Sequence, residues 1–321
     1  MKSEKKHKNY LQIIGILLFI YLLTKIDLLA AYENIKKFNL LWLLVYMLSY
    51  FAMVMLKSYR WNILLIDQGL EFEFKKTIRI SIISNFWGAI TPGRLGELIK
   101  LDYLRKDNTP MVKCLANVVI DRTFDLMMLL IFSFIGALYF GNLFYQQLKG
   151  ILFWGVLILV LMSLFFINRT VVTRLLKLML NKILSPDKYS LLAENWSGFV
   201  GEIRGVKFFS LVKMLLISIV IYLLFFLMTY IVALGFNLRL PFIYLSLCVS
   251  LASLISLLPI SVSGLGTREA IFILLLGKLS VDNSSALIIP FFDSVILGNL
   301  MALLFMGLKD FFIKSKAVDF K

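Results

Sequence analysis

The chain has 321 residues, 60% of them hydrophobic, and a formal net charge of +15 from 34 Lys and Arg against 19 Asp and Glu. Its mean hydropathy of +0.88 is too high for a soluble globular protein, in which about half of the residues are apolar. The composition therefore predicts an integral membrane protein. It also disfavours a nucleic-acid partner, because basic loops beside apolar segments are explained by membrane topology and anionic lipid.

Cysteine and histidine usage excludes several kinds of site. Cys114 and Cys248 lie in apolar segments, and the only histidine, His7, lies in a basic tail. Neither a disulfide framework nor a thiolate metal site is indicated, and a Ser/His/Asp triad would need that tail residue. We therefore expect no catalytic residues, no metal and no cofactor.

Six continuous apolar segments are near the twenty or so residues that cross a bilayer. They are Asn9–Leu23, Phe38–Leu56, Cys114–Phe140, Ile151–Ile167, Phe208–Leu234 and Ala286–Leu308. The first follows the basic start MKSEKKHK, and no small-residue cleavage site follows it. We therefore expect it to be a retained helix rather than a removed signal peptide.

Two further segments, Ile78–Tyr103 and Phe242–Leu279, are apolar but interrupted by Pro and Gly. Proline breaks a helix, and half-helices around an unwound turn are typical of transporter sites. The sequence therefore predicts an all-α, polytopic membrane protein with about eight hydrophobic segments, two of them broken or re-entrant helices.

The two interrupted segments are related within the chain. A shift of 172 residues places Glu97 on Glu269 and Asp121 on Asp293. This indicates an internal duplication with a first half at about 38–140 and a second at about 208–310. The stretch between them, about 168–207, is predicted to be a cytoplasmic connector, which is either an amphipathic helix on the inner leaflet or a plain solvated loop.

The distribution of Lys and Arg predicts the orientation. With cytoplasmic N- and C-termini, the inner loops (1–9, 57–79, 100–113, 168–213 and 309–321) hold 25 Lys and Arg, and the outer loops hold six. This asymmetry follows the positive-inside rule. It also places the two broken segments on opposite sides, so the halves would be inverted around a midplane site.

Charged side chains within these segments are the candidate substrate-binding residues, because charge in lipid is costly. They are Arg94, Glu97, Asp121, Arg122, Asp125, Arg268, Glu269 and Asp293. Half-helix N-termini and arginine suit a phosphate, so a backbone anion pocket is predicted at the interruptions. Its residues would be Pro92, Gly93, Gly96, Gly264 and Gly266. The alternative is that these charges form structural ion pairs, with Arg94–Glu97 and Arg122–Asp125 closing locally.

Another charged stretch, Lys57, Arg60 and Trp61, falls at the end of an apolar run. Basic and aromatic side chains at such places commonly snorkel or anchor the helix at the membrane interface. We therefore expect these three residues to be interfacial anchors.

Four motifs resemble one known family, the transmembrane region of lysylphosphatidylglycerol synthases, also called the flippase-like domain family. They are RW at Arg60–Trp61, TPGRLGELIK at Thr91–Lys100, DRTFD at Asp121–Asp125 and LPISVSGLGTREA at Leu258–Ala270. In the multiple peptide resistance factors a similar domain moves a lysyl-lipid between leaflets and is fused to a cytosolic aminoacyl-transferase domain. We do not expect such a transferase domain in this chain, whose last predicted span ends shortly before Lys321.

The resemblance implies a flippase-like transporter of an anionic lipid or a polyprenyl-phosphate-linked glycan in the plasma membrane. The alternative is a membrane subunit that presents an acceptor lipid to a separate glycosyltransferase or aminoacyl-transferase. An enzymatic role of the chain itself would be related to phosphatidylglycerol lysyltransferase. A homo-oligomer is compatible with either hypothesis.

Overall fold

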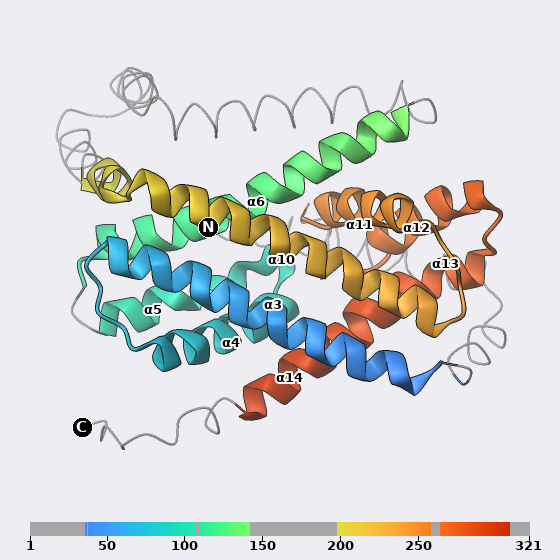
Figure 1. The fold of residues 1–321 in the computed structure, drawn as a ribbon, viewed down its shortest axis with the longest axis horizontal. Helices are drawn as coiled ribbons and strands as arrows, with labels where there is room; N and C mark the ends of the chain where they lie inside the picture. The colour runs from blue at the N-terminus through green and yellow to red at the C-terminus, as the bar shows by residue number, and fades with distance from the viewer. Residues whose placement is uncertain (1–35, 37, 107–108, 142–197, 258–263, 309–321) are drawn as a thin grey trace, which may run out of the picture. The chain divides into compact units, whose positions relative to one another are not determined.

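The computed structural model describes residues 36, 38–106, 109–141, 198–257 and 264–308. Within these residues the chain is helical and contains no β-strand. The helices appear in Figure 1 as α3 (Leu40–Asp67), α4 (Phe74–Ile90), η1 (Pro92–Leu98), α5 (Ile99–Lys106), α6 (Met111–Tyr139), α10 (Phe208–Gly235), α11 (Phe242–Ser256), α12 (Thr267–Leu276), η2 (Gly277–Leu279), α13 (Asn283–Pro290), η3 (Phe291–Gly298) and α14 (Asn299–Leu308). The predicted all-α fold is confirmed.

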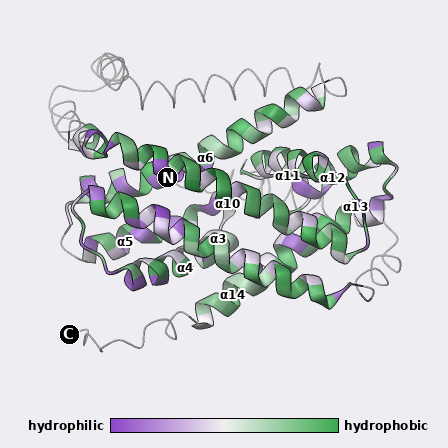
Figure 2. Cartoon of the chain, in the orientation of Figure 1, coloured by the Kyte–Doolittle hydropathy of each residue, from purple (hydrophilic) through white to green (hydrophobic). Residues whose placement is uncertain are grey.

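Three helices in the described part of the chain are long and apolar enough to cross a membrane. They are Leu40–Asp67, Phe208–Gly235 and Asn283–Gly307. Hydrophobic residues cover most of α10 and α11, whereas hydrophilic residues gather around α5 (Figure 2). The predicted spans Asn9–Leu23 and Ile151–Ile167 lie outside the described residues, so the count of eight segments stays a prediction.

The first predicted interruption is confirmed. Helix α4 ends at Ile90, Thr91 is extended, and the 3₁₀ helix η1 begins with Pro92 at its first position. Proline fits a helix start because the first turn does not need its N–H. The Thr91 hydroxyl donates to the Trp87 carbonyl at 2.8 Å and accepts from the Gly96 N–H at 2.6 Å. These bonds close the turn between the two helices.

Glycine is required at position 96 of this turn. A Cβ built on Gly96 would overlap the backbone carbonyl of Trp87. The chain segments of α4 and η1 can therefore approach this closely only without a side chain at Gly96.

The second predicted interruption is also confirmed. Helix α11 ends at Ser256 and α12 begins at Thr267, with residues 258–263 outside the description. Gly264 and Gly266 have φ angles of 80° and 84°, in the left-handed region that glycine adopts without strain. A Cβ on Gly264 would also lie 2.5 Å from the Ser256 Oγ. Glycine at this position therefore allows the chain to turn back against the end of α11.

The last predicted span is a composite helix. Helix α13 continues into a π-helical stretch, η3, and then into α14. Pro290 cannot donate a backbone hydrogen bond, and the Ser294 hydroxyl donates to the Pro290 carbonyl at 2.6 Å. Both features loosen the regular helical ladder, and π-helical turns are frequent at functional sites. Asp293 lies within this wider stretch.

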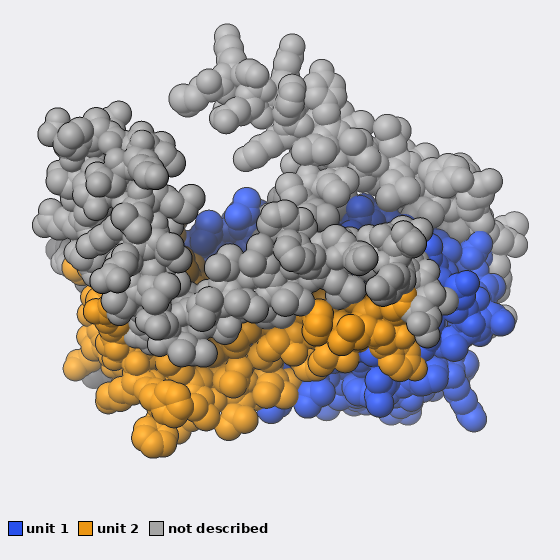
Figure 3. All heavy atoms as spheres, turned by 90° about the horizontal axis from the view of Figure 1, so that it is seen from above, with its two compact units in different colours: residues 1–59, 73–99, 220–321 blue, residues 60–72, 100–219 orange. Residues whose placement is uncertain are grey.

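The chain forms two compact units, coloured separately in Figure 3. Unit 1 comprises residues 1–59, 73–99 and 220–321, and unit 2 comprises residues 60–72 and 100–219. Within unit 1, α12 packs against α11 and α13, and α4 packs against η1 and α14. Unit 1 thus takes segments from both predicted sequence halves, and it contains both helix interruptions.

Candidate functional site

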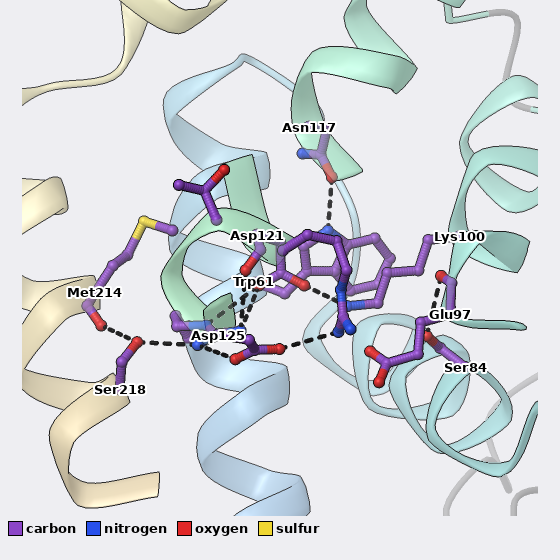
Figure 4. Close-up of polar contacts among 12 residues, drawn as sticks. Trp61, Ser84, Glu97, Lys100, Asn117, Asp121, Asp125, Met214 and Ser218 are labelled. Atoms are coloured by element: carbon purple, nitrogen blue, oxygen red, sulfur yellow. Dashed lines mark hydrogen bonds and ion pairs between the residues drawn. The ribbon is translucent and has the colours of Figure 1, made fainter. Parts of the chain in front are cut away.

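The first interruption places an arginine beside a buried glutamate. The Arg94 side chain is 51% exposed and the Glu97 side chain 5%, and Arg94 Nη1 lies 4.0 Å from Glu97 Oε1. Arg94 has a φ of 56°, which is uncommon for a residue with a side chain and is found where the surroundings impose it. The Glu97 carbonyl accepts a hydrogen bond from Ser84 at 3.3 Å (Figure 4). The Glu97 side chain is therefore buried, whereas the Arg94 side chain is exposed and accessible to a ligand.

The second interruption repeats this arrangement. Arg268 Nη2 lies 3.3 Å from Glu269 Oε1, and Glu269 is fully buried. The other Glu269 oxygen accepts the Gly266 N–H at 2.6 Å, which caps the start of α12. The Arg268 Nε is buried and has no hydrogen-bond partner in the part of the chain that the structure describes. This guanidinium therefore keeps donor capacity beyond its pair with Glu269.

Asp293 is a further buried carboxylate of unit 1. Its two carboxylate oxygens accept hydrogen bonds from the Tyr46 hydroxyl at 2.9 Å and the Thr229 hydroxyl at 2.5 Å. Arg268 lies within electrostatic range of both Asp293 and Tyr46. Helices α3, α10 and α12 thus supply the surroundings of this carboxylate.

Helix α3 also reaches the first interruption. Tyr50 lies one helical turn after Tyr46, accepts a hydrogen bond from the Asn85 side chain at 2.9 Å and lies within electrostatic range of Arg94. Helix α3 therefore places two tyrosine hydroxyl groups one turn apart. The Tyr50 hydroxyl lies near Arg94, and the Tyr46 hydroxyl lies near Arg268. Sequence reasoning missed both, because hydroxyl-bearing aromatics in an apolar run look like ordinary packing residues.

Unit 2 contains a buried ionic cluster centred on Arg60, which is 1% exposed. Its Nη2 lies 2.9 Å from Asp121 Oδ1, and its Nη1 lies 2.7 Å from Asp125 Oδ1. Nη1 also donates to the Ser218 hydroxyl at 2.9 Å. Asp121 and Asp125, four residues apart on α6, lie on one helical face, since both reach the same guanidinium.

Two further cations complete this cluster. Lys100 Nζ lies 2.7 Å from the second oxygen of Asp121, and Arg122 Nη2 lies 3.0 Å from Asp125 Oδ2. Lys100 Nζ also lies 4.6 Å from the ring centroid of Trp61, a cation–π contact. Figure 4 shows Asp121, Asp125, Lys100 and Trp61 converging.

Trp61 is fixed by a short chain of polar contacts. Its Nε1 donates to the Asn117 side chain at 2.7 Å (Figure 4), and the Asn117 amide donates to Gln68 at 2.7 Å. The indole is fully buried. These contacts hold the ring under Lys100.

The prediction that Arg60 and Trp61 are interfacial anchors is wrong. Both are fully buried in unit 2 and make the contacts described above. Their partner Asp121 lies 61 positions along the chain, so local sequence cannot reveal the pairing. One signal was present in the sequence. The motif DRTFD has two Asp and one Arg, so one of its carboxylates needs a cation from elsewhere in the chain.

The predicted substrate-binding residues are distributed over the two units. Unit 1 contains Arg94, Glu97, Arg268, Glu269 and Asp293, and unit 2 contains Asp121, Arg122 and Asp125. The local ion pairs Arg94–Glu97 and Arg122–Asp125, which the structural alternative predicted, are present.

The predicted anion pocket involves backbone N–H groups that already have partners. The Gly96 N–H is bound by Thr91 and the Gly266 N–H by Glu269. An anion would have to displace these acceptors, whereas Arg94 and Arg268 offer side-chain donors directly. The described residues contain no group of three His, Cys, Asp or Glu suited to a metal ion.

The two buried aspartates have related surroundings. The shift of 172 residues that places Asp121 on Asp293 also places Tyr46 on Ser218. Ser218 of α10 contacts the Asp121 cluster through Arg60, and Tyr46 of α3 contacts Asp293. Each aspartate also has a partner from the other long helix, Arg60 or Thr229. The long helices α3 and α10 thus both contribute to the surroundings of each aspartate, and the internal duplication stays a prediction.

The fold and these buried ionic sites define a helical membrane protein with two interrupted helices in one compact unit. Comparison with known proteins identifies its family. Residues 11–304 match the model of the lysylphosphatidylglycerol synthase TM region, and the chain belongs to this family.

Two curated relatives are similar over most of their length. UPF0104 membrane protein PH1989 of Pyrococcus horikoshii is 26% identical over 310 residues, which cover 90% of this chain and 92% of the relative. UPF0104 membrane protein MJ1078 of Methanocaldococcus jannaschii is 24% identical over 225 residues, which cover 67% of this chain and 92% of the relative. No solved structure matches the chain.

Proposed function

We propose that this protein moves a lipid with an anionic, phosphate-bearing headgroup between membrane leaflets. One observation carries the proposal: both interrupted helices lie in unit 1, and each presents an arginine paired with a buried glutamate. Interrupted helices with exposed donors are how membrane transporters build binding sites within the bilayer. The family's description, which names a phospholipid synthase, supports a lipid as the substrate.

Arg94 and Arg268 are the proposed phosphate ligands. The guanidinium group presents a planar set of donors that matches phosphate oxygens, and such charge-assisted bonds are stronger than neutral ones. Glu97 and Glu269 would balance the arginine charges when no lipid is bound. A loose pair such as Arg94–Glu97, at 4.0 Å, can be opened by a competing anion more readily than the close contacts of the unit 2 cluster.

The orientation and location of the protein belong to this proposal. The Lys and Arg distribution supports cytoplasmic termini, and a plasma-membrane lipid substrate is consistent with the family. Asp121, Arg122 and Asp125 would line or support the lipid path. Polyprenyl-phosphate-linked glycans share the phosphate chemistry and are covered by the same proposal.

A second candidate is a membrane subunit of a lipid-modifying enzyme. The family description favours it by naming a synthase. In that role the arginines would hold an acceptor lipid for a separate glycosyltransferase or aminoacyl-transferase. Binding of an anionic lipid without movement between leaflets would support this second function over the first.

A leaflet-accessibility assay tests the proposal. Purified protein in liposomes would be given a fluorescent anionic phospholipid or a zwitterionic one, and a membrane-impermeant quencher would report the lipid that has changed leaflet. We expect the anionic lipid to move faster, and the Arg94→Gln and Arg268→Gln variants to lose at least tenfold in rate.

Arg239→Gln is the matched control, because Arg239 is exposed and lies outside both interruptions. It should transport at the wild-type rate. Wild-type rates in both Arg94→Gln and Arg268→Gln would contradict the assignment of the phosphate ligands. Absence of movement of either lipid with the wild-type protein would contradict the transport function itself.

A further inference from the structure

Asp293 differs from the other buried carboxylates of the described chain in the kind of partner that it has. Glu97, Glu269, Asp121 and Asp125 each form an ion pair with Arg or Lys. Asp293 forms no ion pair among the described residues and is bound by two neutral hydroxyls, those of Tyr46 and Thr229. A buried carboxylate without a paired cation is costly unless it can bind a proton.

The chemistry of the partners allows both protonation states. A hydroxyl group can donate or accept a hydrogen bond, whereas the Arg and Lys side chains can only donate. Tyr46 and Thr229 can therefore donate to an ionised Asp293, and one of them can rotate to accept from a protonated Asp293. Asp121 has no such freedom, because Arg60 and Lys100 both donate to it.

The local backbone and the neighbouring charge add to this argument. Asp293 lies in the π-helical stretch η3, where the ladder of the composite helix is wider than in a regular α-helix. The charged group in electrostatic range is Arg268 of α12, which is paired with Glu269. On α3, Tyr46 bonds to Asp293 and Tyr50 lies one turn away. The other titratable residues of α3 begin about three helical turns after Tyr46, at Lys57. Helices α13 and α14, which contact η3, contain no titratable residue.

We infer that Asp293 is a proton-binding site and that it couples lipid movement to proton movement. This inference rests on the proposed function and deepens it. A proton binds to a carboxylate oxygen of Asp293 from one side of the membrane and leaves to the other side during the transport cycle, with no covalent change. Protonation removes a negative charge that acts on Arg268, so the guanidinium becomes more available to the lipid phosphate.

Infrared difference spectroscopy tests proton binding without requiring transport. In purified protein, the carbonyl-stretch band of a protonated carboxylic acid should appear as the pH is lowered and disappear as it is raised. Because the other Asp and Glu side chains also absorb when protonated, one component of the band should be missing in Asp293→Asn and present in the control Asp282→Asn, which changes an N-cap carboxylate of α13. A band identical to that of the wild type in a folded Asp293→Asn protein would overturn the inference.

A second variant covers the case in which Asp293→Asn does not fold. Thr229→Val has a similar volume and removes one of the two hydroxyl partners but keeps the carboxyl group. It should shift the pH at which the band disappears, because a hydrogen bond to the carboxylate is lost. An unchanged band in Thr229→Val would contradict the assignment to Asp293.

Transport under a pH gradient tests the coupling. Wild-type liposomes with an imposed gradient should move the anionic lipid at least threefold faster in one gradient direction than in the other, and Asp293→Asn should abolish this difference. Lipid movement that ignores the gradient would overturn the coupling and leave the proposed transport intact. If neither lipid moves under any gradient, both the transport function and the coupling are contradicted.

Discussion

Asp121 and Asp293 are two buried aspartates with different kinds of partner. The two residues correspond under the shift that predicts the two sequence halves, and each is buried between contributions of α3 and α10. Asp121 accepts from Arg60 and Lys100 at 2.7–3.2 Å. Asp293 accepts from two hydroxyl groups instead.

Because of this difference in partners, we expect the charge of Asp121 to be fixed and the charge of Asp293 to change with protonation. Two donor-only cations keep Asp121 ionised and require it to stay in place, since a buried cation left without its partner is strongly unfavourable. Neutral hydroxyls leave Asp293 able to change its protonation state. We therefore expect the unit 2 cluster to stabilise the structure and so to support the lipid path, whereas Asp293 and the nearby arginines carry the proposed transport.

The largest expected effect is the loss of the Arg60 guanidinium. Arg60→Ala would leave Asp121 with Lys100 as its remaining cation and would remove a contact of Asp125, so the free energy of unfolding should fall by about 3–5 kcal/mol. Thermal unfolding of the detergent-solubilised protein measures this. Arg239→Ala, at an exposed arginine, is the control and should change stability little. A stability loss in Arg60→Ala no greater than in the control would contradict a structural role of the cluster.

An intermediate effect is expected at the first helix interruption. Gly96→Ala would force a methyl group against the Trp87 carbonyl, and such overpacking typically costs about 1–3 kcal/mol. Because the turn carries Arg94, the leaflet-accessibility assay should also show slower lipid movement. Gly277→Ala is the matched control, since a Cβ there meets no atom within 4 Å. Equal rates and stabilities for the two variants would contradict the packing argument.

The smallest effect is expected for Tyr46→Phe, which removes one hydroxyl from Asp293 and leaves Thr229 in place. A single hydrogen bond contributes about 0.5–1.5 kcal/mol to stability. The comparison with Arg60→Ala is the informative one, because the two side chains are α3 residues that contact corresponding aspartates. A Tyr46→Phe protein as unstable as Arg60→Ala would show that the two sites do not differ as described.

Much of the helix pattern could be predicted from particular residues. Pro92 and Gly96 indicated the first interruption, and Gly264 and Gly266 indicated the second. Proline and glycine change the backbone conformation at their own positions, so their effect can be predicted locally. The four-residue spacing of Asp121 and Asp125 places both on one face of a helix. Such features depend on the local backbone conformation, which is determined by residues that are close together in the sequence.

The partners of the buried charges could not be predicted in the same way. Arg60 lies near the end of a predicted span, and nothing near it in sequence indicates a contact with Asp121. The hydroxyls of Tyr46 and Thr229 occur in apolar runs where packing is the ordinary explanation. For Tyr46, the shift that pairs it with Ser218 offered a signal, and this signal becomes informative once the contacts of Ser218 are known.

The most direct test of this account measures stability and transport on Asp121→Asn and Asp293→Asn from matched preparations. We expect Asp121→Asn to lose about 3–5 kcal/mol of stability, because buried Lys100 loses its carboxylate partner and Arg60 loses one of its two. Asp293→Asn should stay within about 1 kcal/mol of the wild type, because an amide can bond to both hydroxyls, and it should lose the dependence of lipid movement on a pH gradient. The reverse outcome, a destabilised Asp293→Asn protein and a stable Asp121→Asn protein, would contradict the division between a fixed and a variable charge.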